Sequence, residues 1–399
     1  RLRTIYVATT YTDIISTSNL PDALRTIYSA DLEFTATPMM VFDQFTESKN
    51  DFKADRGQTV VWTIYRQLAP SISALSETVD VDGNQIQDFQ VTFSVAEHGY
   101  AIGTTEKLDL LSYHGPIANI VRDLLAPQMA LTVDTLARNA FYAGAPTTYA
   151  NGAANRAALT TSDVATIDII KQEAYRLSAQ RVRPAGSDYI CVAHPAVIYD
   201  LREDSLWQNA GVYSDPNRLL SGEVGRIFGV RFVESHQARL ANAGAQVAQT
   251  TLSNAYSVGV DQIDVASASG FSAGDEITIF AAANSTPDGT DPTQENVIIE
   301  SISSNTLTLR HGLAVAHASG AKVRLAVDIY PLMFLGAQKP VGKGTVLAPE
   351  VRVALKIDKL QRMSYIGWYG LFGYGTIRDW TYSVVETSAS QSGAYTFGF

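Results

Sequence analysis

The sequence predicts a mixed fold of helices and strands, built on one long helix, one projecting β-hairpin and a late all-β segment. The helix is expected over residues 115–143, where apolar residues recur every three or four positions and so share one face. The hairpin is expected from two strand-like stretches, 57–66 and 86–95, which enclose a long polar segment. Helix and strand patterns alternate after the long helix, which is typical of an α+β or α/β domain.

The composition is that of a globular chain with more than one domain. The chain has 399 residues, which is too long for one ordinary core. Hydrophobic residues make up 46% and charged residues 18%, which excludes a disordered chain. The formal charge of −10 argues against a dedicated nucleic-acid binder, because such a protein needs a basic surface to neutralise phosphates. One local basic surface stays compatible with that charge.

The long helix is unusual in length and carries one fault. Pro116 is suited to a first helical turn, and Gly144 to the position just past the end. At 1.5 Å per residue, the helix would be roughly 40 Å long, far above the usual length. Pro127 lacks a backbone donor, so we expect it to kink or split the helix. Taken alone, this pattern favours an ordinary buried core helix. Only the segments on either side of it favour a different role.

Both segments before the helix need support from elsewhere. Residues 1–55 are expected to form an extended arm, because their apolar residues follow no sustained period. In the hairpin, Phe89, Val91, Phe93 and Val95 alternate with polar residues. An isolated hairpin is marginal in water, so this one is expected to rest on a partner.

The region after the long helix predicts further helices and strands. Ser162 or Asp163 is suited to cap a helix over the residues that follow. Residues 188–204 read as a buried strand and a helix that starts near Pro195, and residues 222–235 as a Gly-rich turn into a strand.

From residue 256 to 325 the pattern becomes all-β, which is typical of a small barrel or sandwich. Residues 236–254 are small and polar and are expected to be a linker. The host pattern resumes near Asp328, so we expect an inserted module whose two ends lie close together. The expected strands are Gln262–Ala266, Glu276–Ala281, Val297–Ile302 and Thr306–Arg310.

No motif indicates catalysis, a cofactor or a metal, so we expect no catalytic, cofactor-binding or metal-binding residue. None of the six histidines has ligand spacing with another. Asp288, Asp291 and Glu295 could hold Ca²⁺ through oxygen ligands, but a solvated acidic loop is the better interpretation. The single cysteine, Cys191, lies in an apolar stretch and is expected to be an inert buried thiol. No apolar run approaches a membrane span and the start has no signal-peptide pattern, so no membrane partner is expected.

Four stretches, taken in order, resemble the major capsid proteins of tailed phages with the Hong Kong 97 fold. The similarity is greatest to the gp56-like family typified by coliphage N-four, and it spans nearly the whole chain except 245–325. The stretches are 25–45 (N-terminal arm), 57–68 with 90–107 (extended loop), 222–235 (axial turn and strand) and 362–380 (late peripheral strands).

This resemblance implies an α+β fold with an arm, an extended β-hairpin loop, a spine helix, peripheral and axial domains, and a small inserted all-β domain. The expected boundaries are 1–55 for the arm, 56–96 for the extended loop, 97–160 and 346–399 for the peripheral domain with spine helix 115–143, 161–245 and 326–345 for the axial domain, and 246–325 for the insertion.

The resemblance also implies a structural function, self-assembly through hexamers and pentamers into the icosahedral shell of a tailed double-stranded DNA bacteriophage. An arm without its own core and a projecting hairpin agree with it, because repeated contacts between such subunits build closed shells. The expected partners are other copies of the chain, a portal, a scaffold, a cement or decoration protein, and packaged DNA held by weak non-specific contacts. The expected location is the virion, after assembly in the cytoplasm of the bacterial host.

Two predictions, the role of two arginines and the function of the protein, each have an alternative. Arg122 and Arg138 are candidates for facing the DNA, and local pairing with carboxylates is an equal alternative. An encapsulin-like compartment around protein cargo, or a glycan-binding virion surface protein, are the alternative functions.

Overall fold

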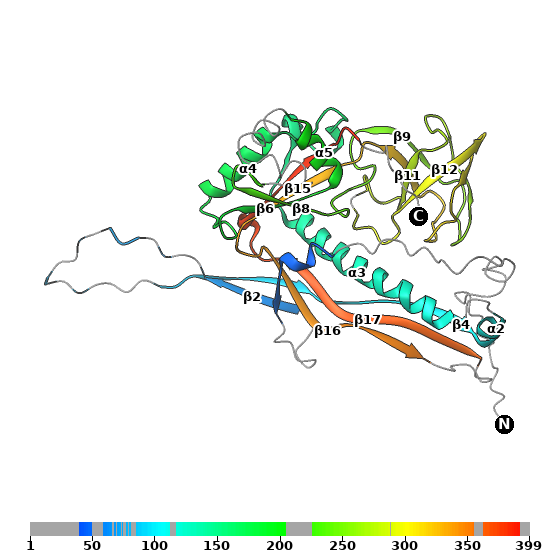
Figure 1. The fold of residues 1–399 in the computed structure, drawn as a ribbon, viewed down its shortest axis with the longest axis horizontal. Helices are drawn as coiled ribbons and strands as arrows, with labels where there is room; N and C mark the ends of the chain where they lie inside the picture. Colours follow the sequence, from blue (N-terminus) through cyan, green and yellow to red (C-terminus); the bar gives the residue numbers. More distant parts are fainter. Residues whose placement is uncertain are drawn as a thin grey trace, which may run out of the picture. The chain divides into compact units, whose positions relative to one another are not determined.

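The computed structural model describes residues 40–49, 59–65, 68, 70–72, 74, 77–78, 80, 85–111, 117–204, 226–287, 289–354 and 362–391 (Figure 1). The chain divides into two compact units, Arg1–Leu136 with Gly342–Ile377 and Ala137–Val341 with Arg378–Phe399. Most of the expected arm, parts of the hairpin tip and the tail after residue 391 lie outside the described residues. The finer boundaries of five domains stay predictions.

The first unit is built on a sheet whose described strands run in the order β1-β16-β17-β4. β4 and β17 pair antiparallel, from Met363 opposite Thr105 to Phe372 opposite Ala96. The short helix α2 (Glu106–Leu111) follows β4 directly. The strands are β1 (Thr46–Lys49), β4 (Ala96–Thr105), β16 (Val341–Ala354) and β17 (Met363–Thr376).

The predicted long helix is present as α3 (Ile117–Gly144). Its apolar face places Val121, Leu125 and Val133 against β17, in one buried cluster with Trp368 (Figure 1). The helix continues through Pro127, so the structure does not show the split that this proline predicts. Residues on both sides of the proline are buried in the same cluster, and this burial offsets the lost backbone hydrogen bond.

The predicted hairpin is also present, as β2 (Thr59–Tyr65) and β3 (Asp88–Ser94). The strands pair antiparallel from Thr59 opposite Ser94 to Tyr65 opposite Asp88. Because side chains alternate across a strand, this register gives the hairpin one apolar and one polar face.

The second unit contains a sheet in the order β5-β18-β15-β6-β8-β7. Helices α4 (Ile167–Ala179) and α5 (Pro195–Glu203) contribute their apolar faces to its core. α5 begins at Pro195 as predicted, whereas α4 begins after Thr166 rather than at Ser162 or Asp163. The Asp163 carboxylate instead accepts the N–H of Thr160 and closes its own turn. The strands are β5 (Thr147–Tyr149), β6 (Tyr189–Ala193), β7 (Arg226–Ile227), β8 (Val230–Glu234), β15 (Tyr330–Leu335) and β18 (Tyr382–Thr387).

The predicted all-β segment forms a second sheet of the same unit, in the order β10-β13-β12-β11-β14-β9. All members of its buried cluster lie between Ala248 and Val323, so the sheet has a core of its own. The strands are β9 (Gln246–Thr251), β10 (Gln262–Asp264), β11 (Glu276–Phe280), β12 (Glu295–Ser303), β13 (Thr306–Leu309) and β14 (Lys322–Ala326).

The expected linker over 236–254 is wrong. Part of it is β9, which pairs with β14 at the edge of this sheet. The preceding residues include Ala238 and Ala243, which are fully buried. A stretch of such small residues has the composition of a linker. Here the small side chains allow buried backbone segments to pack closely. Four short 3₁₀ helices complete the described elements, η1 (Asp43–Phe45), η2 (Ala150–Gly152), η3 (Arg156–Ala158) and η4 (Asp379–Thr381).

Candidate functional site

The hairpin is anchored at its base. Val60 and Trp62 of β2 are buried in a cluster with Val95 and Ile377. The opposite face of β2 carries exposed residues such as Thr59 and Thr63, as the alternating pattern predicts. The base of the hairpin is therefore part of the first unit, whose core fixes its position.

Toward its tip the hairpin presents apolar side chains to solvent. Leu68 is 64% exposed, Ile72 93% and Ile86 70%. Fully burying a side chain of this kind contributes about 1.5–3 kcal/mol. Large apolar side chains exposed on one projecting element offer a surface that another protein can bury.

The residues before β1 are held by a polar cluster in the first unit. The Asp134 carboxylate on α3 accepts the N–H groups of Phe42 and Asp43, at 2.7 and 3.1 Å. The Asp43 carboxylate accepts Lys343 Nζ at 2.8 Å and the Tyr374 hydroxyl at 2.6 Å. Burial raises the pKa of Asp134 despite these backbone donors, and the nearby Asp43 carboxylate adds to that rise. This cluster joins the described end of the arm to α3, β16 and β17.

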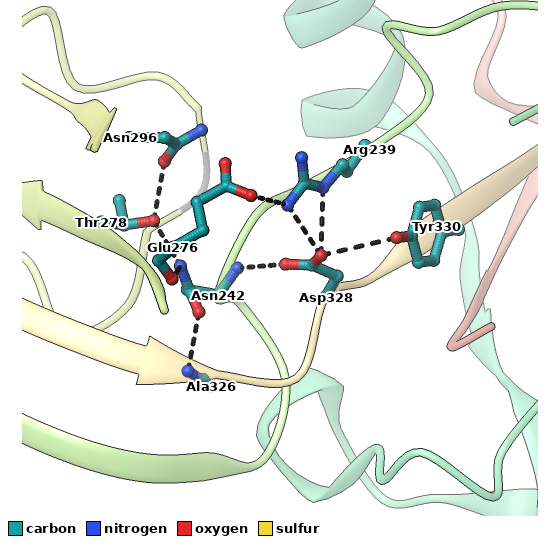
Figure 2. A network of polar contacts seen from close by, with 8 residues as sticks. All are labelled: Arg239, Asn242, Glu276, Thr278, Asn296, Ala326, Asp328 and Tyr330. Carbon is teal, nitrogen blue, oxygen red and sulfur yellow. Dashed lines mark hydrogen bonds and ion pairs between the residues drawn. The ribbon is translucent and has the colours of Figure 1, made fainter. Parts of the chain in front are cut away.

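A second polar cluster joins the two sheets of the second unit (Figure 2). The Arg239 guanidinium donates to Glu276 Oε2 at 2.6 Å and to Asp328 Oδ2 at 2.8 Å. Glu276 begins β11, and Asp328 lies between β14 and β15. The cation therefore connects a strand of the all-β sheet to the segment that enters the other sheet.

Asn242 makes the same junction through its backbone and its amide (Figure 2). Its N–H donates to Asp328 Oδ1 at 2.9 Å, and its Oδ1 accepts the N–H of Ala326 at 2.7 Å. Its Nδ2 donates to the Glu276 carbonyl and to Thr278 Oγ1, both at 3.0 Å. The backbone φ is +53°, a left-handed conformation that asparagine adopts more readily than most residues. Only asparagine combines this conformation with these four hydrogen bonds.

At the junction, the attraction between the ion pairs and the cost of burying them act in opposite directions. The Asp328 and Glu276 carboxylates raise the pKa of Arg239 despite its burial. Burial raises the pKa of Glu276, and the Arg239 guanidinium offsets this rise only in part. The desolvation of buried ion pairs commonly cancels their attraction, so such a pair positions its elements more than it stabilises them.

The described members of the acidic loop, Asp291 and Glu295, have structural roles. Asp291 accepts the N–H groups of Ala281 and Thr293 and shapes its own loop. Glu295 accepts His317 Nε2 at 2.6 Å, and Asp288 lies outside the described residues. Among the described residues, no group of three or more His, Cys, Asp and Glu is placed to hold a metal ion. Cys191 is fully buried in β6, and this burial raises its pKa well above the usual thiol value.

The two arginines predicted to face DNA have different outcomes. The Arg122 side chain lies outside the described residues. Arg138 Nη1 donates to the Gln237 carbonyl at 3.2 Å, and its Nη2 donates to Asn139 Oδ1 at 2.9 Å. These contacts with a carbonyl and an amide favour a structural role for Arg138. Within the described residues, no helix combines the length and apolar character needed to cross a bilayer.

The sequence did not indicate Arg239, Asn242 and Asp328 as a site. Arg239 and Asp328 are 89 positions apart. The available signal was weak, an arginine and an asparagine among small residues in a stretch that resembled a linker.

The described residues thus define a structural subunit, with buried polar junctions and a hairpin that presents apolar side chains outward. The chain belongs to the phage capsid protein family, whose profile matches residues 35–378. A search of curated protein sequences finds no significant match.

Solved phage capsids share the fold. The capsid of cyanophage P-SCSP1u matches with a TM-score of 0.58 and 13% identity, over 96% of this chain and 100% of that one. The capsid of Ralstonia phage GP4 matches with a TM-score of 0.57 and 12% identity, over 92% and 95% of the two chains. The mature capsid of bacteriophage PhiM1 matches with a TM-score of 0.54 and 14% identity, over 95% of this chain and 96% of that one. At these identities the likeness shows the fold alone, and it confirms the predicted α+β capsid class.

Proposed function

We propose that the chain is the major capsid protein of a tailed double-stranded DNA bacteriophage and self-assembles through hexamers and pentamers into an icosahedral shell. The observation that carries this proposal is the hairpin, whose base is fixed by buried Val60 and Trp62 while Leu68, Ile72 and Ile86 are exposed. Such an element is completed by a neighbouring subunit. Repetition of a heterologous contact closes a ring of subunits. Rings of five and six subunits then form a shell through further contacts between rings. Membership of the phage capsid protein family supports the same role.

The finer assignment, to the Hong Kong 97 type and its gp56-like family typified by coliphage N-four, is also proposed. Its support is the order of hairpin, long helix and late strands along the chain. Within this scheme, residues 246–325 form an inserted domain, supported by the separate buried cluster between Ala248 and Val323. We place this domain on the outer face, because an insert of this size would collide with a packed genome inside.

The proposed partners follow from the role. They are other copies of the chain, a portal, scaffold and cement or decoration proteins, and packaged DNA through weak non-specific contacts. The proposed location is the virion, after assembly in the host cytoplasm. The role is structural and not enzymatic, in line with a family of shell proteins.

Electron microscopy of the purified full-length chain tests the proposal. We expect closed icosahedral shells above a threshold protein concentration, with the outer face carrying density for residues 246–325. A chain that stays monomeric or forms only irregular aggregates contradicts the proposal. Density for the insertion on the inner face contradicts the outer placement alone.

The contents of the particles distinguish a phage shell from an encapsulin-like compartment. In particles purified from infected cells, nuclease-protected DNA supports the phage shell, and a specific protein cargo without DNA supports an encapsulin-like compartment. Glycan binding by the full chain, without shells, supports a glycan-binding virion surface protein.

A further inference from the structure

The turn between β7 and β8 has an unusual residue in a demanding conformation. Phe228 and Gly229 form this turn, with φ values of +48° and +74°. Two successive residues with positive φ are typical of the type I′ hairpin turn, which prefers asparagine, aspartate or glycine at its first position. A bulky side chain at positive φ is an outlier that needs an explanation.

Few contacts within the chain offset the conformational cost at Phe228. The side chain is 53% exposed. The contact found among the described residues is with Lys171, whose Nζ lies 4.8 Å from the ring centroid. The backbone around the ring is firmly held, because the Gly229 carbonyl accepts the N–H of Tyr189 at 2.8 Å. A rigid turn therefore holds an aromatic ring in solvent.

The surroundings of the ring are basic. Arg226 and Arg231 lie directly opposite each other across the hairpin, and both are exposed. Like charges in this position destabilise a strand pair. Arg226 pairs with Asp188 and Lys171 with Asp168, both at 3.2 Å, whereas no ion pair of Arg231 is found among the described residues. The chain as a whole has a formal charge of −10, so a second copy offers an excess of acidic residues to these cations.

We propose that Phe228 and its basic rim, Lys171, Arg226 and Arg231, form a docking point for a second copy of this chain. The ring enters an apolar site on the neighbour, and the cations face acidic residues around that site. Aromatic and arginine side chains are enriched at the centres of protein interfaces, where they contribute most of the binding free energy. Contact with another subunit also explains why strain is kept at an exposed turn. This inference rests on the proposed function as a shell subunit.

Nucleic acid is the other partner that a basic surface suggests. Phosphate contacts would use the three cations but give no reason for a rigid, strained turn beneath the phenylalanine. The combination of ring, strain and charge therefore favours a protein partner.

The substitution Phe228→Asn in the full-length chain tests the inference with two readouts of opposite sign. Asparagine suits the positive φ, so the melting temperature of the unassembled subunit is expected to rise by about 2 °C or more. Loss of the ring is expected to raise the concentration needed for assembly by at least about tenfold, which is the effect of losing one ordinary interface anchor.

Arg181→Asn is the matched control. Arg181 is exposed and also has a positive φ, +59°, after the end of α4. This variant is expected to gain thermal stability while assembling at the wild-type concentration.

Three outcomes overturn the inference. One is wild-type assembly of the Phe228→Asn variant, another is a lower melting temperature, and a third is loss of DNA affinity with unchanged assembly. If the wild-type chain forms no shells, the proposed function fails separately. In that case, sedimentation velocity compares the self-association of the wild type with that of the Phe228→Asn variant. Equal self-association overturns the role of Phe228.

Discussion

The Asp134 carboxylate on α3 accepts the backbone N–H of Phe42 at 2.7 Å, across 92 positions of sequence. The same oxygen accepts the N–H of Asp43 at 3.1 Å. Since both donors belong to the backbone, the contact depends on Asp134 and on the path of the arm, but not on the arm's side chains. One helix residue thus fixes the backbone position of Phe42 and Asp43.

We expect Asp134→Ala to lower the free energy of unfolding by about 2–4 kcal/mol, because two donors in a buried region lose their acceptor. Asp134→Asn keeps an acceptor oxygen and is expected to lose clearly less. Urea unfolding of the unassembled chain, followed by tryptophan fluorescence, measures both. Equal stability of Asp134→Ala and the wild type would contradict the role of this carboxylate.

Arg239→Met is expected to be more damaging than its size suggests. The substitution leaves the carboxylates of Glu276 and Asp328 buried without their shared cation. Breaking a buried pair in this way costs about 3–5 kcal/mol. Arg352→Met is the matched control, because the pair of Arg352 and Glu350 is about half exposed and its loss is worth roughly 0–1 kcal/mol. Similar losses in the two variants would refute the importance of the junction.

His194 predicts a specific acid sensitivity. Burial, with Arg239 and His236 nearby, lowers its pKa to about 4. Its Nδ1 accepts the N–H of Ala196 at the start of α5, which protonation prevents. The unfolded chain, with a histidine pKa of about 6.5, binds more protons between these values. Stability is therefore expected to fall as the pH drops from about 6.5 to 4, by up to about 3 kcal/mol.

The measurement compares the wild type with His194→Asn, which keeps a capping oxygen but does not titrate. Carboxylates titrate in both proteins, so the difference between their unfolding free energies isolates the histidine. This difference is expected to shift in favour of the variant as the pH falls. A difference that stays constant from pH 7 to 4 would rule out the assignment.

The sequence predicted what local periodicity encodes and missed what depends on distant pairing. α3 and the hairpin were predictable because their apolar residues repeat at the helical and strand periods. β9 was missed because its burial is restricted to small or polar positions such as Ala248 and Thr250. The junction of Arg239 and Asp328 was missed because the two residues meet only when both sheets have formed. Composition gave only a weak sign of it, an arginine and an asparagine among small residues.

The all-β sheet is expected to fold without its host. Its buried cluster lies entirely between Ala248 and Val323, and β9 covers the edge of β14. A fragment of residues 245–327 is therefore expected to give dispersed amide signals and a cooperative thermal transition. A fragment of residues 254–326 lacks β9, exposes the edge of β14 and is expected to be less stable or to aggregate. A disordered longer fragment would show that the sheet needs the junction to Arg239.

Removal of the hairpin tip tests how the subunit meets its neighbours. Replacement of Ser71–Asn84 by a short Asn-Gly turn leaves the paired strands β2 and β3 and the buried base intact. We expect the unassembled chain to keep its melting temperature within about 2 °C, since surface changes away from buried contacts usually have small effects. Assembly is expected to be lost or to need a much higher concentration.

The same result is expected from serine at three exposed apolar positions, Leu68, Ile72 and Ile86, because burial of each side chain by a partner would contribute about 1.5–3 kcal/mol. Val258→Ser, at a 62% exposed position in a turn between β9 and β10, is the control for loss of exposed apolar area. Light scattering against concentration, with electron microscopy of the products, compares the three proteins with the wild type. Normal shells from both hairpin variants would remove the hairpin from the assembly contacts. Failure of the control as well would mean that exposed apolar area in general drives association.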